Sequence, residues 1–202
     1  MFAVFALFVF YMHLDDLNAL DADAAARELL RCCGSTRWAD RLAAARPFRD
    51  FPTLADSADR IWWQLERADW LEAFAAHPRI GAGGAGGAGG AERAGGAGPE
   101  RWSAQEQSGV AGVSRDVAER LATANSEYAS RFGYIFIICA TGKSAAEMLD
   151  ALEGRLAHSP EQELGFAAEE QRKITRLRLS KLLDTGGAPL QVGTSQRGPN
   201  RS

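Results

Sequence analysis

Two adjacent stretches in the middle of the chain contain residues that could do chemistry. The first is a histidine before a proline, His77-Pro78. Histidine has the side-chain pKa closest to neutrality, so His77 is a candidate acid or base. The second, Gly81-x-Gly83-x-x-Gly86, has the spacing of a dinucleotide-binding loop.

The glycine spacing does not predict a nucleotide site. A dinucleotide loop follows a β-strand, and its glycines let the backbone approach a pyrophosphate at a helix N-terminus. Here the run follows a predicted helix, and residues 82–98 are almost entirely Gly and Ala, so the spacing arises by chance. We interpret residues 82–98 as a flexible Gly/Ala loop on the surface.

His77 is the histidine best placed for acid–base chemistry, because His13 and His158 occupy positions typical of surface or capping residues. Beyond the loop, Ser103-x-x-Glu106 has the spacing of a helix capping box, which would explain both residues without any function. A helix N-terminus also suits an anionic ligand. A Glu106 carboxylate near His77 would raise the imidazole pKa and orient its proton.

Other site chemistries lack their residues. The sequence has three histidines, and three cysteines (Cys32, Cys33 and Cys139) without CxxC spacing, so we predict neither a metal site nor a disulfide framework. No nucleophile elbow, HExxH motif or P-loop is present. A net charge of -3 leaves no basic field, so we expect neither nucleic acid nor a membrane as partner.

Apolar periodicity predicts helices over most of the chain, and the capping residues mark where they begin. We expect a helix from Asp21 or Asp23 to Gly34, one from Ser35 to Pro47, one after Thr53, one after Asp69 that ends before Pro78, and others after Ser103, Ser114, Ser144 and Ser159, the last to about Leu183.

Residues 134–140 form the one strand-like stretch, rich in aromatic and β-branched side chains. A single strand cannot form a sheet, so we predict an all-α protein, a compact multi-helix bundle of about eight helices with one extended segment lining the site. We expect one domain over residues 12–184, between an apolar N-terminal extension (1–11) and a disordered tail (185–202). Residues 1–11 are too short to cross a bilayer.

Several motifs in one order resemble the 2-oxo-4-hydroxy-4-carboxy-5-ureidoimidazoline (OHCU) decarboxylases. They are His77-Pro78-Arg79-Ile80-Gly81, Trp102-Ser103-x-x-Glu106-Gln107-x-Gly109, Asn125-x-x-Tyr128-x-x-Arg131-Phe132-Gly133, the stretch IFIICATG, and Glu169-Glu170-Gln171-x-x-Ile174-x-x-Leu177. The resemblance spans roughly residues 14–183. It implies a cofactor-free carboxy-lyase that converts OHCU to (S)-allantoin in urate degradation, which is part of purine degradation.

The resemblance also implies site residues. His77 matches the catalytic proton donor, assisted by Glu106, and Pro78 matches a residue that shapes the ring pocket. The substrate-binding positions are Pro78, Ser103, Glu106 and Gln107, together with a wall that meets the substrate through its main chain: Phe136, Ile137, Ile138, Cys139 and Ala140. The Gly/Ala loop is longer than we expect of the family. Arg131 is either an anion partner or a solvent-facing residue, and we favour the latter.

Partners and location follow from the same resemblance. It implies a homodimer and a functional association with a hydroxyisourate hydrolase. The chain ends Pro199-Asn200-Arg201-Ser202, without the Ser-Lys-Leu of peroxisomal members, so we predict a cytoplasmic protein. Two alternatives stay open: a non-catalytic ureide-binding helical module of the same fold, and a nucleotide-binding protein that uses the glycine loop.

Overall fold

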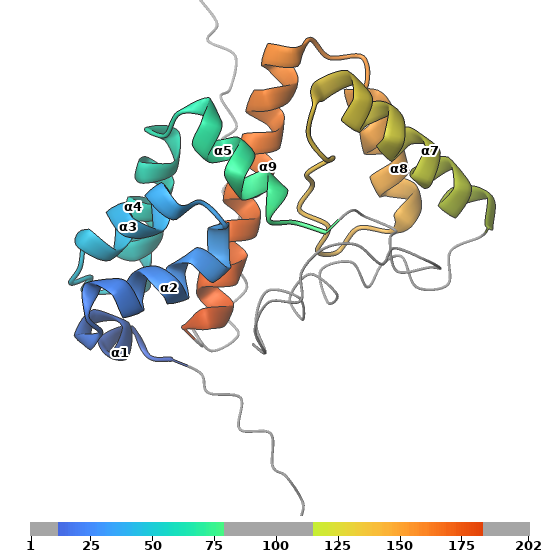
Figure 1. The fold of residues 1–202 in the computed structure, drawn as a ribbon. Coiled ribbons are helices and arrows are strands. Elements are labelled where there is room, and N and C mark those ends of the chain that lie inside the picture. The colour runs from blue at the N-terminus through green and yellow to red at the C-terminus, as the bar shows by residue number, and fades with distance from the viewer. Residues whose placement is uncertain (1–11, 79–114, 184–202) are drawn as a thin grey trace, which may run out of the picture.

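The structure, a computed structural model, describes residues 12–78 and 115–183 (Figure 1). These two ranges contain eight α-helices and no strand, so the predicted all-α class is confirmed. The apolar extension, the Gly/Ala loop, the tail and the helix expected after Ser103 lie outside the described residues and remain predictions.

The first described range contains five helices whose boundaries follow from their capping residues. Asp21 caps α2 and Ser35 caps α3, as predicted. Two helices begin earlier than predicted: Asp50 caps α4, and Glu66 caps α5. A short first helix, α1, was not predicted. The helices are α1 (Leu14–Ala19), α2 (Ala22–Cys33), α3 (Thr36–Ala44), α4 (Phe51–Trp63) and α5 (Arg67–Ala75).

The second range contains α7 (Arg115–Phe132), α8 (Ala145–Arg155) and α9 (Pro160–Leu182). Gly133 follows α7 with a left-handed φ of 80°, as the predicted helix end requires. Ser144 and Ser159 precede α8 and α9, as predicted, and each forms a capping box with the third residue of its helix. Within residues 12–78 and 115–183, no helix is long and apolar enough to span a bilayer.

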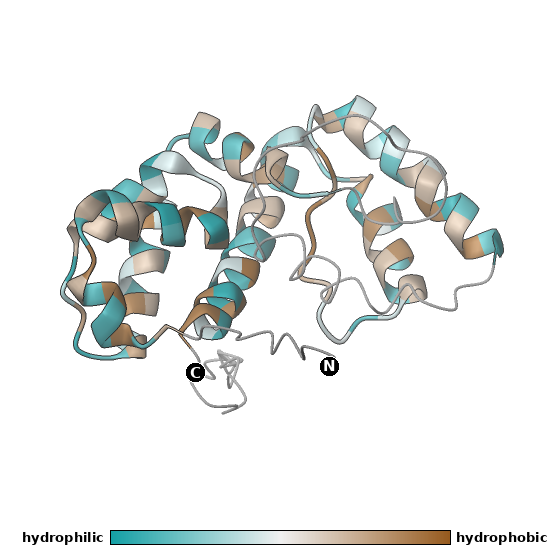
Figure 2. Cartoon of the chain, turned by 60° about the horizontal axis from the view of Figure 1, so that its bottom comes forward, coloured by the Kyte–Doolittle hydropathy of each residue, from teal (hydrophilic) through white to brown (hydrophobic). Residues whose placement is uncertain are grey.

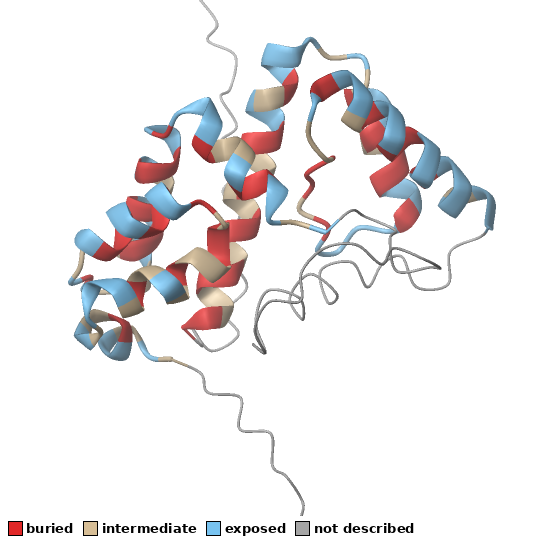
Figure 3. Cartoon of the chain, in the orientation of Figure 1, coloured by how far each residue is buried: buried red, intermediate tan, exposed pale blue. Residues whose placement is uncertain are grey.

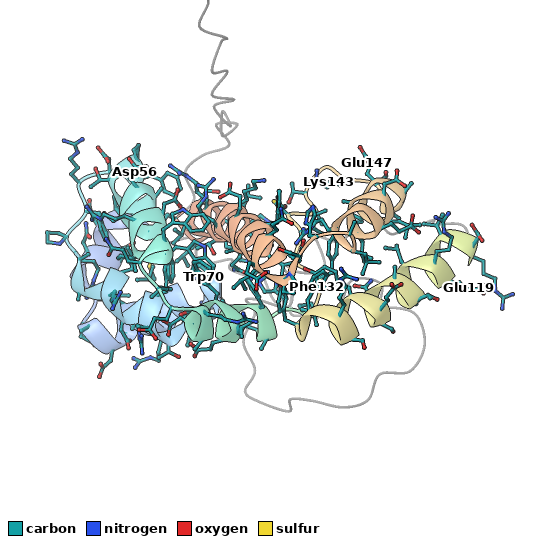
Figure 4. The ribbon with its side chains drawn as sticks, turned by 90° about the horizontal axis from the view of Figure 1, so that it is seen from above. Asp56, Trp70, Glu119, Phe132, Lys143 and Glu147 are labelled. Atoms are coloured by element: carbon teal, nitrogen blue, oxygen red, sulfur yellow. The ribbon has the colours of Figure 1, made fainter. Side chains whose placement is uncertain are left out.

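Helix α9 lies between two groups of helices (Figures 1 and 4). On one side it contacts α2, α4 and α5, and the buried Trp62 indole of α4 donates a hydrogen bond to the Ala168 carbonyl of α9 (2.9 Å). On the other side lie α7 and α8, which pack on each other. Phe132 marks the end of α7 near α9, while Glu119 lies towards the outer end (Figure 4).

The core divides into two hydrophobic clusters, and the segment 134–140 runs between them. Ile137 is buried in the cluster of α2–α5 and α9, whereas Phe136 and Ile138 are buried in the cluster of α7 and α8. This alternation is the period of two that extended backbone imposes. Figures 2 and 3 show the segment as hydrophobic and largely buried. The predicted extended conformation is therefore confirmed, although no strand pairs with it within the described ranges.

Gly34 lets the end of α2 approach the end of α5. Its φ is +85°, and a Cβ atom built on it would lie 2.6 Å from the Cβ of Ala76. Both the backbone conformation and the contact therefore require a residue without a side chain. The residue that follows Ala76 is His77, so this close approach fixes the backbone next to the candidate site.

We predict that Gly34→Ala destabilises the protein more than Gly133→Ala. Both glycines have φ near +80°, which costs an L-residue about 1–2 kcal/mol, but a Cβ on Gly133 would meet nothing within 4 Å. Overpacking against Ala76 adds about 1–3 kcal/mol to the cost of Gly34→Ala alone. Denaturant unfolding followed by circular dichroism measures the difference, and equal losses for the two variants would contradict the close contact.

Candidate active site

His77 lies just beyond the end of α5, where the sequence predicted it. Its backbone N–H donates to the Phe74 carbonyl (3.2 Å) in the last turn, and Pro78 follows outside the helix. One turn earlier, the Phe74 ring contacts Tyr134, with ring centroids 5.2 Å apart. The same helix end therefore presents the imidazole and packs against the start of the extended segment.

Two buried polar residues of α9 act on the His77 imidazole. Its pKa is lowered to about 4, mainly by burial and also by the positive charge of Arg178, while the Gln171 side chain acts in the opposite direction. Gln171 is fully buried and Arg178 is 4% exposed. The imidazole is therefore neutral at neutral pH, a form that accepts a proton. Glu106, expected to raise this pKa, lies outside the described residues.

Side chains of α8 and α9 bind the backbone of the extended segment. Arg155 donates from Nη1 to the Ile137 carbonyl (2.8 Å), and the Cys139 N–H donates to the Glu170 carboxylate (2.8 Å). These bonds replace part of the pairing that a neighbouring strand would give. The Ile137 carbonyl and the Cys139 N–H of the wall, predicted to meet the substrate through its main chain, are therefore already paired within the chain.

Arg155 belongs to a buried polar network centred on Glu163. The fully buried Glu163 accepts from Arg155 Nε (2.8 Å) and from the Tyr128 hydroxyl, and its Oε2 lies 2.7 Å from His158 Nδ1. Burial and the hydrogen bond to Glu163 raise the pKa of the Tyr128 hydroxyl. The guanidinium also lies over the Phe136 ring, 4.6 Å from its centroid. The Glu163 carboxylate thus positions the Arg155 guanidinium, which in turn binds the backbone of the wall.

His158 departs from its prediction as a surface or capping residue. Besides its contact with Glu163, its ring stacks on Phe166 with centroids 4.7 Å apart. His13, by contrast, is the exposed N-cap residue of α1, as predicted. The solvent-facing interpretation of Arg131 is also supported, since its exposed side chain donates to the His158 carbonyl (3.3 Å).

The predicted site residues fall into two sets. The structure places His77 and Pro78 at the end of α5, and Phe136, Ile137, Ile138, Cys139 and Ala140 in the extended segment. Ser103, Glu106 and Gln107 lie outside the described residues, so their positions remain predictions. In the part of the chain described, no group of three or more His, Cys, Asp and Glu side chains is arranged to hold a metal ion.

Sequence reasoning missed Arg155, Glu163 and Arg178 as residues around the site. One signal was present: Glu163, Gln171 and Arg178 occupy the buried stripe of α9 together with Ala167, Ile174 and Leu182. Charged residues are almost never fully buried without a partner, so such residues in an apolar stripe indicate an internal polar network. Their partners, however, come from distant segments that the stripe does not identify.

A concave surface lies between α7 and α8. It is an open groove lined by Asp116, Glu119, Arg120, Thr123, Ala124, Glu127, Glu153 and Leu156. No predicted site residue lines it, and Arg120 in its wall is paired with Glu153 (2.8 Å). The candidate site is therefore the region around His77 and the extended segment.

The fold and the position of His77 define an all-α protein with a candidate acid–base residue at the end of a helix that packs on the extended segment. The family model of OHCU decarboxylase matches residues 18–180, and the chain belongs to that family. It is 38% identical over 170 residues to the uric acid degradation bifunctional protein TTL of Arabidopsis thaliana, covering 83% of this chain and 50% of that protein. This membership confirms the predicted family.

Two further relatives are covered over nearly their whole length. The OHCU decarboxylase of Haloferax volcanii is 27% identical over 169 residues, which are 83% of this chain and 94% of that protein. The solved structure of an OHCU decarboxylase in the presence of (S)-allantoin superposes with a TM-score of 0.65 at 38% identity, covering 78% of this chain and 97% of that one. In contrast, the chain spans only a third to a half of the bifunctional relatives.

We predict that Glu163→Gln destabilises the protein by about 3–5 kcal/mol, because it leaves the Arg155 charge buried without a carboxylate. The matched control is Glu153→Gln, which removes the carboxylate from the exposed pair with Arg120 and is expected to change stability by about 0–1 kcal/mol. Chemical denaturation of both variants measures the two free energies of unfolding. A loss at Glu163 no larger than the control's would contradict the network's structural role.

Proposed function

We propose that this chain decarboxylates OHCU to (S)-allantoin and carbon dioxide, without a cofactor, in the degradation of urate. Family membership supports this activity. So do two relatives that are named OHCU decarboxylase and that this chain matches over nearly their whole length. The observation that carries the proposal is the position of the His77 imidazole at the end of α5, where it is largely buried and the buried Arg178 of α9 acts on it.

The reaction needs proton transfer rather than an added electron sink. When the carboxylate leaves ring carbon 4 as carbon dioxide, the neighbouring C=N bond accepts the electron pair and an enol forms across carbons 4 and 5. The enol hydroxyl then gives up its proton, while the ring nitrogen and carbon 5 each take one. The substrate anion therefore consumes one proton overall, which solvent supplies to the ring nitrogen, and carbon 5 becomes the stereocentre.

His77 can serve both ends of this transfer. A neutral imidazole accepts the hydroxyl proton and becomes the imidazolium that protonates carbon 5. This sequence gives the predicted proton donor a source for its proton despite its low pKa. Glu106, at its position beyond the loop, would orient the imidazolium. Ser103 and Gln107 would bind the substrate beside it, and Pro78 would shape the ring pocket.

Arg178 and the wall would orient the ring. A buried guanidinium that acts on His77 is suited to accompany the substrate carboxylate. Because the Ile137 carbonyl and the Cys139 N–H already have intramolecular partners, recognition of the ureide falls to the other main-chain groups of 136–140. A wall on one side of the ring leaves the opposite face to the proton, which explains a single enantiomer.

The proposal extends to the partners that the sequence indicated. A homodimer and a functional association with a hydroxyisourate hydrolase remain part of it, and the bifunctional names of the Arabidopsis and Bacillus relatives support a linked second activity in those proteins. We also expect the cytoplasm as the location of the protein.

We predict that His77→Ala lowers kcat by about 10²–10⁴-fold, the usual contribution of a general acid–base residue. His13→Ala, which removes an exposed imidazole at the start of α1, is the control and keeps full turnover. Circular dichroism follows (S)-allantoin formation from OHCU freshly generated from urate. Full activity of His77→Ala would contradict the proposal, and ureide binding without turnover by the unmodified chain would favour the binding module.

We predict that the His77 pKa in the ligand-free chain lies near 4, well below 6.5, because burial and Arg178 disfavour the imidazolium. A depressed histidine pKa means that the unfolded chain binds the proton first. The stability from neutral His77 is therefore present above pH 6.5 and lost as the pH falls through about 4.

An NMR pH titration that follows the ring carbons of the three histidines measures this pKa. The signal that is missing in His77→Ala belongs to His77. The acid limb of kcat/KM is expected at the same pH, since it reports the free enzyme. A His77 pKa at or above 6.5 would contradict the prediction. Glu106→Gln would then show whether that carboxylate outweighs burial.

A further inference from the structure

Two buried polar side-chain atoms at the candidate site have no hydrogen-bond partner among the described residues. They are Nε2 of His77 and Oε1 of Gln171, and together with the Tyr134 hydroxyl they are the buried side-chain atoms of this kind among the described residues. A buried polar atom without a partner costs about 1–3 kcal/mol, so native proteins keep few of them. Two on neighbouring side chains require a common explanation.

The hydrogen bonds of its nitrogen fix the orientation of the Gln171 amide. Its nitrogen donates to the Cys33 carbonyl (3.3 Å) and to the Thr175 hydroxyl (3.2 Å). Because the Cys33 carbonyl oxygen only accepts hydrogen bonds, the nitrogen of the Gln171 amide, and not its oxygen, must point towards Cys33. The amide oxygen is then the atom presented towards His77, on which Gln171 acts as a hydrogen-bonding side chain.

The backbone places these residues together independently of the amide. Cys33 is the last residue of α2, and Gly34 beside it is the residue whose missing Cβ admits Ala76. His77 follows Ala76 directly. The ends of α2 and α5 and the middle of α9 therefore meet at one point, and Gln171 connects them.

We propose that Gln171 is a positioning residue for His77: its side-chain oxygen accepts a hydrogen bond from Nε2 and leaves Nδ1 as the nitrogen that exchanges a proton with the substrate. An amide oxygen cannot donate, so the ring nitrogen opposite it must carry hydrogen. A neutral imidazole has one hydrogen on its two nitrogens, so the hydrogen on Nε2 leaves Nδ1 without one and fixes the tautomer. The part of this inference that concerns substrate rests on the proposed function; the tautomer does not.

The test reads the tautomer directly. In the ¹⁵N-labelled full chain, long-range ¹H–¹⁵N correlations distinguish the protonated from the unprotonated ring nitrogen of each of the three histidines. At neutral pH we expect hydrogen on Nε2 of His77 and none on Nδ1. Hydrogen on Nδ1 in the unmodified chain would overturn the proposal.

Two variants separate positioning from simple packing. Gln171→Leu removes the acceptor, so we expect His77 to shift towards the Nδ1–H tautomer and kcat to fall about tenfold with little change in KM, the rate equivalent of one hydrogen bond. Gln171→Glu keeps an acceptor, so it should restore the Nε2–H tautomer and move the acid limb of kcat/KM to higher pH. Arg178, the charged group that acts on His77, is unchanged in both.

Thr175→Val is the matched control, because it removes a partner of the same amide but leaves the oxygen in place. We expect it to preserve the tautomer of His77. An unchanged tautomer in Gln171→Leu, in a chain whose circular dichroism shows it folded, would overturn the positioning role. If the chain shows the expected tautomers but no decarboxylation, the proposed reaction fails and the positioning role stands.

Discussion

The structure depends on an extended segment that has no neighbouring strand in the described ranges. Residues 134–140 run between two hydrophobic clusters, where their backbone groups cannot be left to water. Charged side chains therefore enter the core to bind them: Arg155 holds the Ile137 carbonyl, and Glu170 holds the Cys139 N–H. Arg155 is in turn held by Glu163, since a buried guanidinium needs a carboxylate.

The same requirement explains why α9 carries so many polar residues on its buried side. Glu163 and Glu170 serve the extended segment, directly or through Arg155, and further along the helix Gln171 and Arg178 act on His77. Because α9 packs between both groups of helices, it sets the imidazole and the wall relative to each other. In the proposed reaction, acid–base chemistry at His77 and recognition by the wall would therefore both depend on this one helix.

Local signals in the sequence predicted most of the fold, and long-range contacts explain what they missed. Asp21, Ser35, Ser144 and Ser159 cap helices through bonds to residues three positions away, which the sequence displays. Thr53 and Asp69 were placed before their helices, yet each is the third helical residue, bonded to Asp50 or Glu66 ahead of it. His77 was identified by its motif. The role of Gln171, whose amide binds Cys33 138 residues away, could not be.

The most direct measurement of the central claim is a crystal structure of this chain with (S)-allantoin bound. We predict that the ureide lies between the His77 imidazole and the wall 136–140, with carbon 5 facing the imidazole. Its hydrogen bonds go to main-chain groups other than the Ile137 carbonyl and the Cys139 N–H. A ligand bound instead in the groove between α7 and α8, or beyond hydrogen-bond reach of His77, would contradict it.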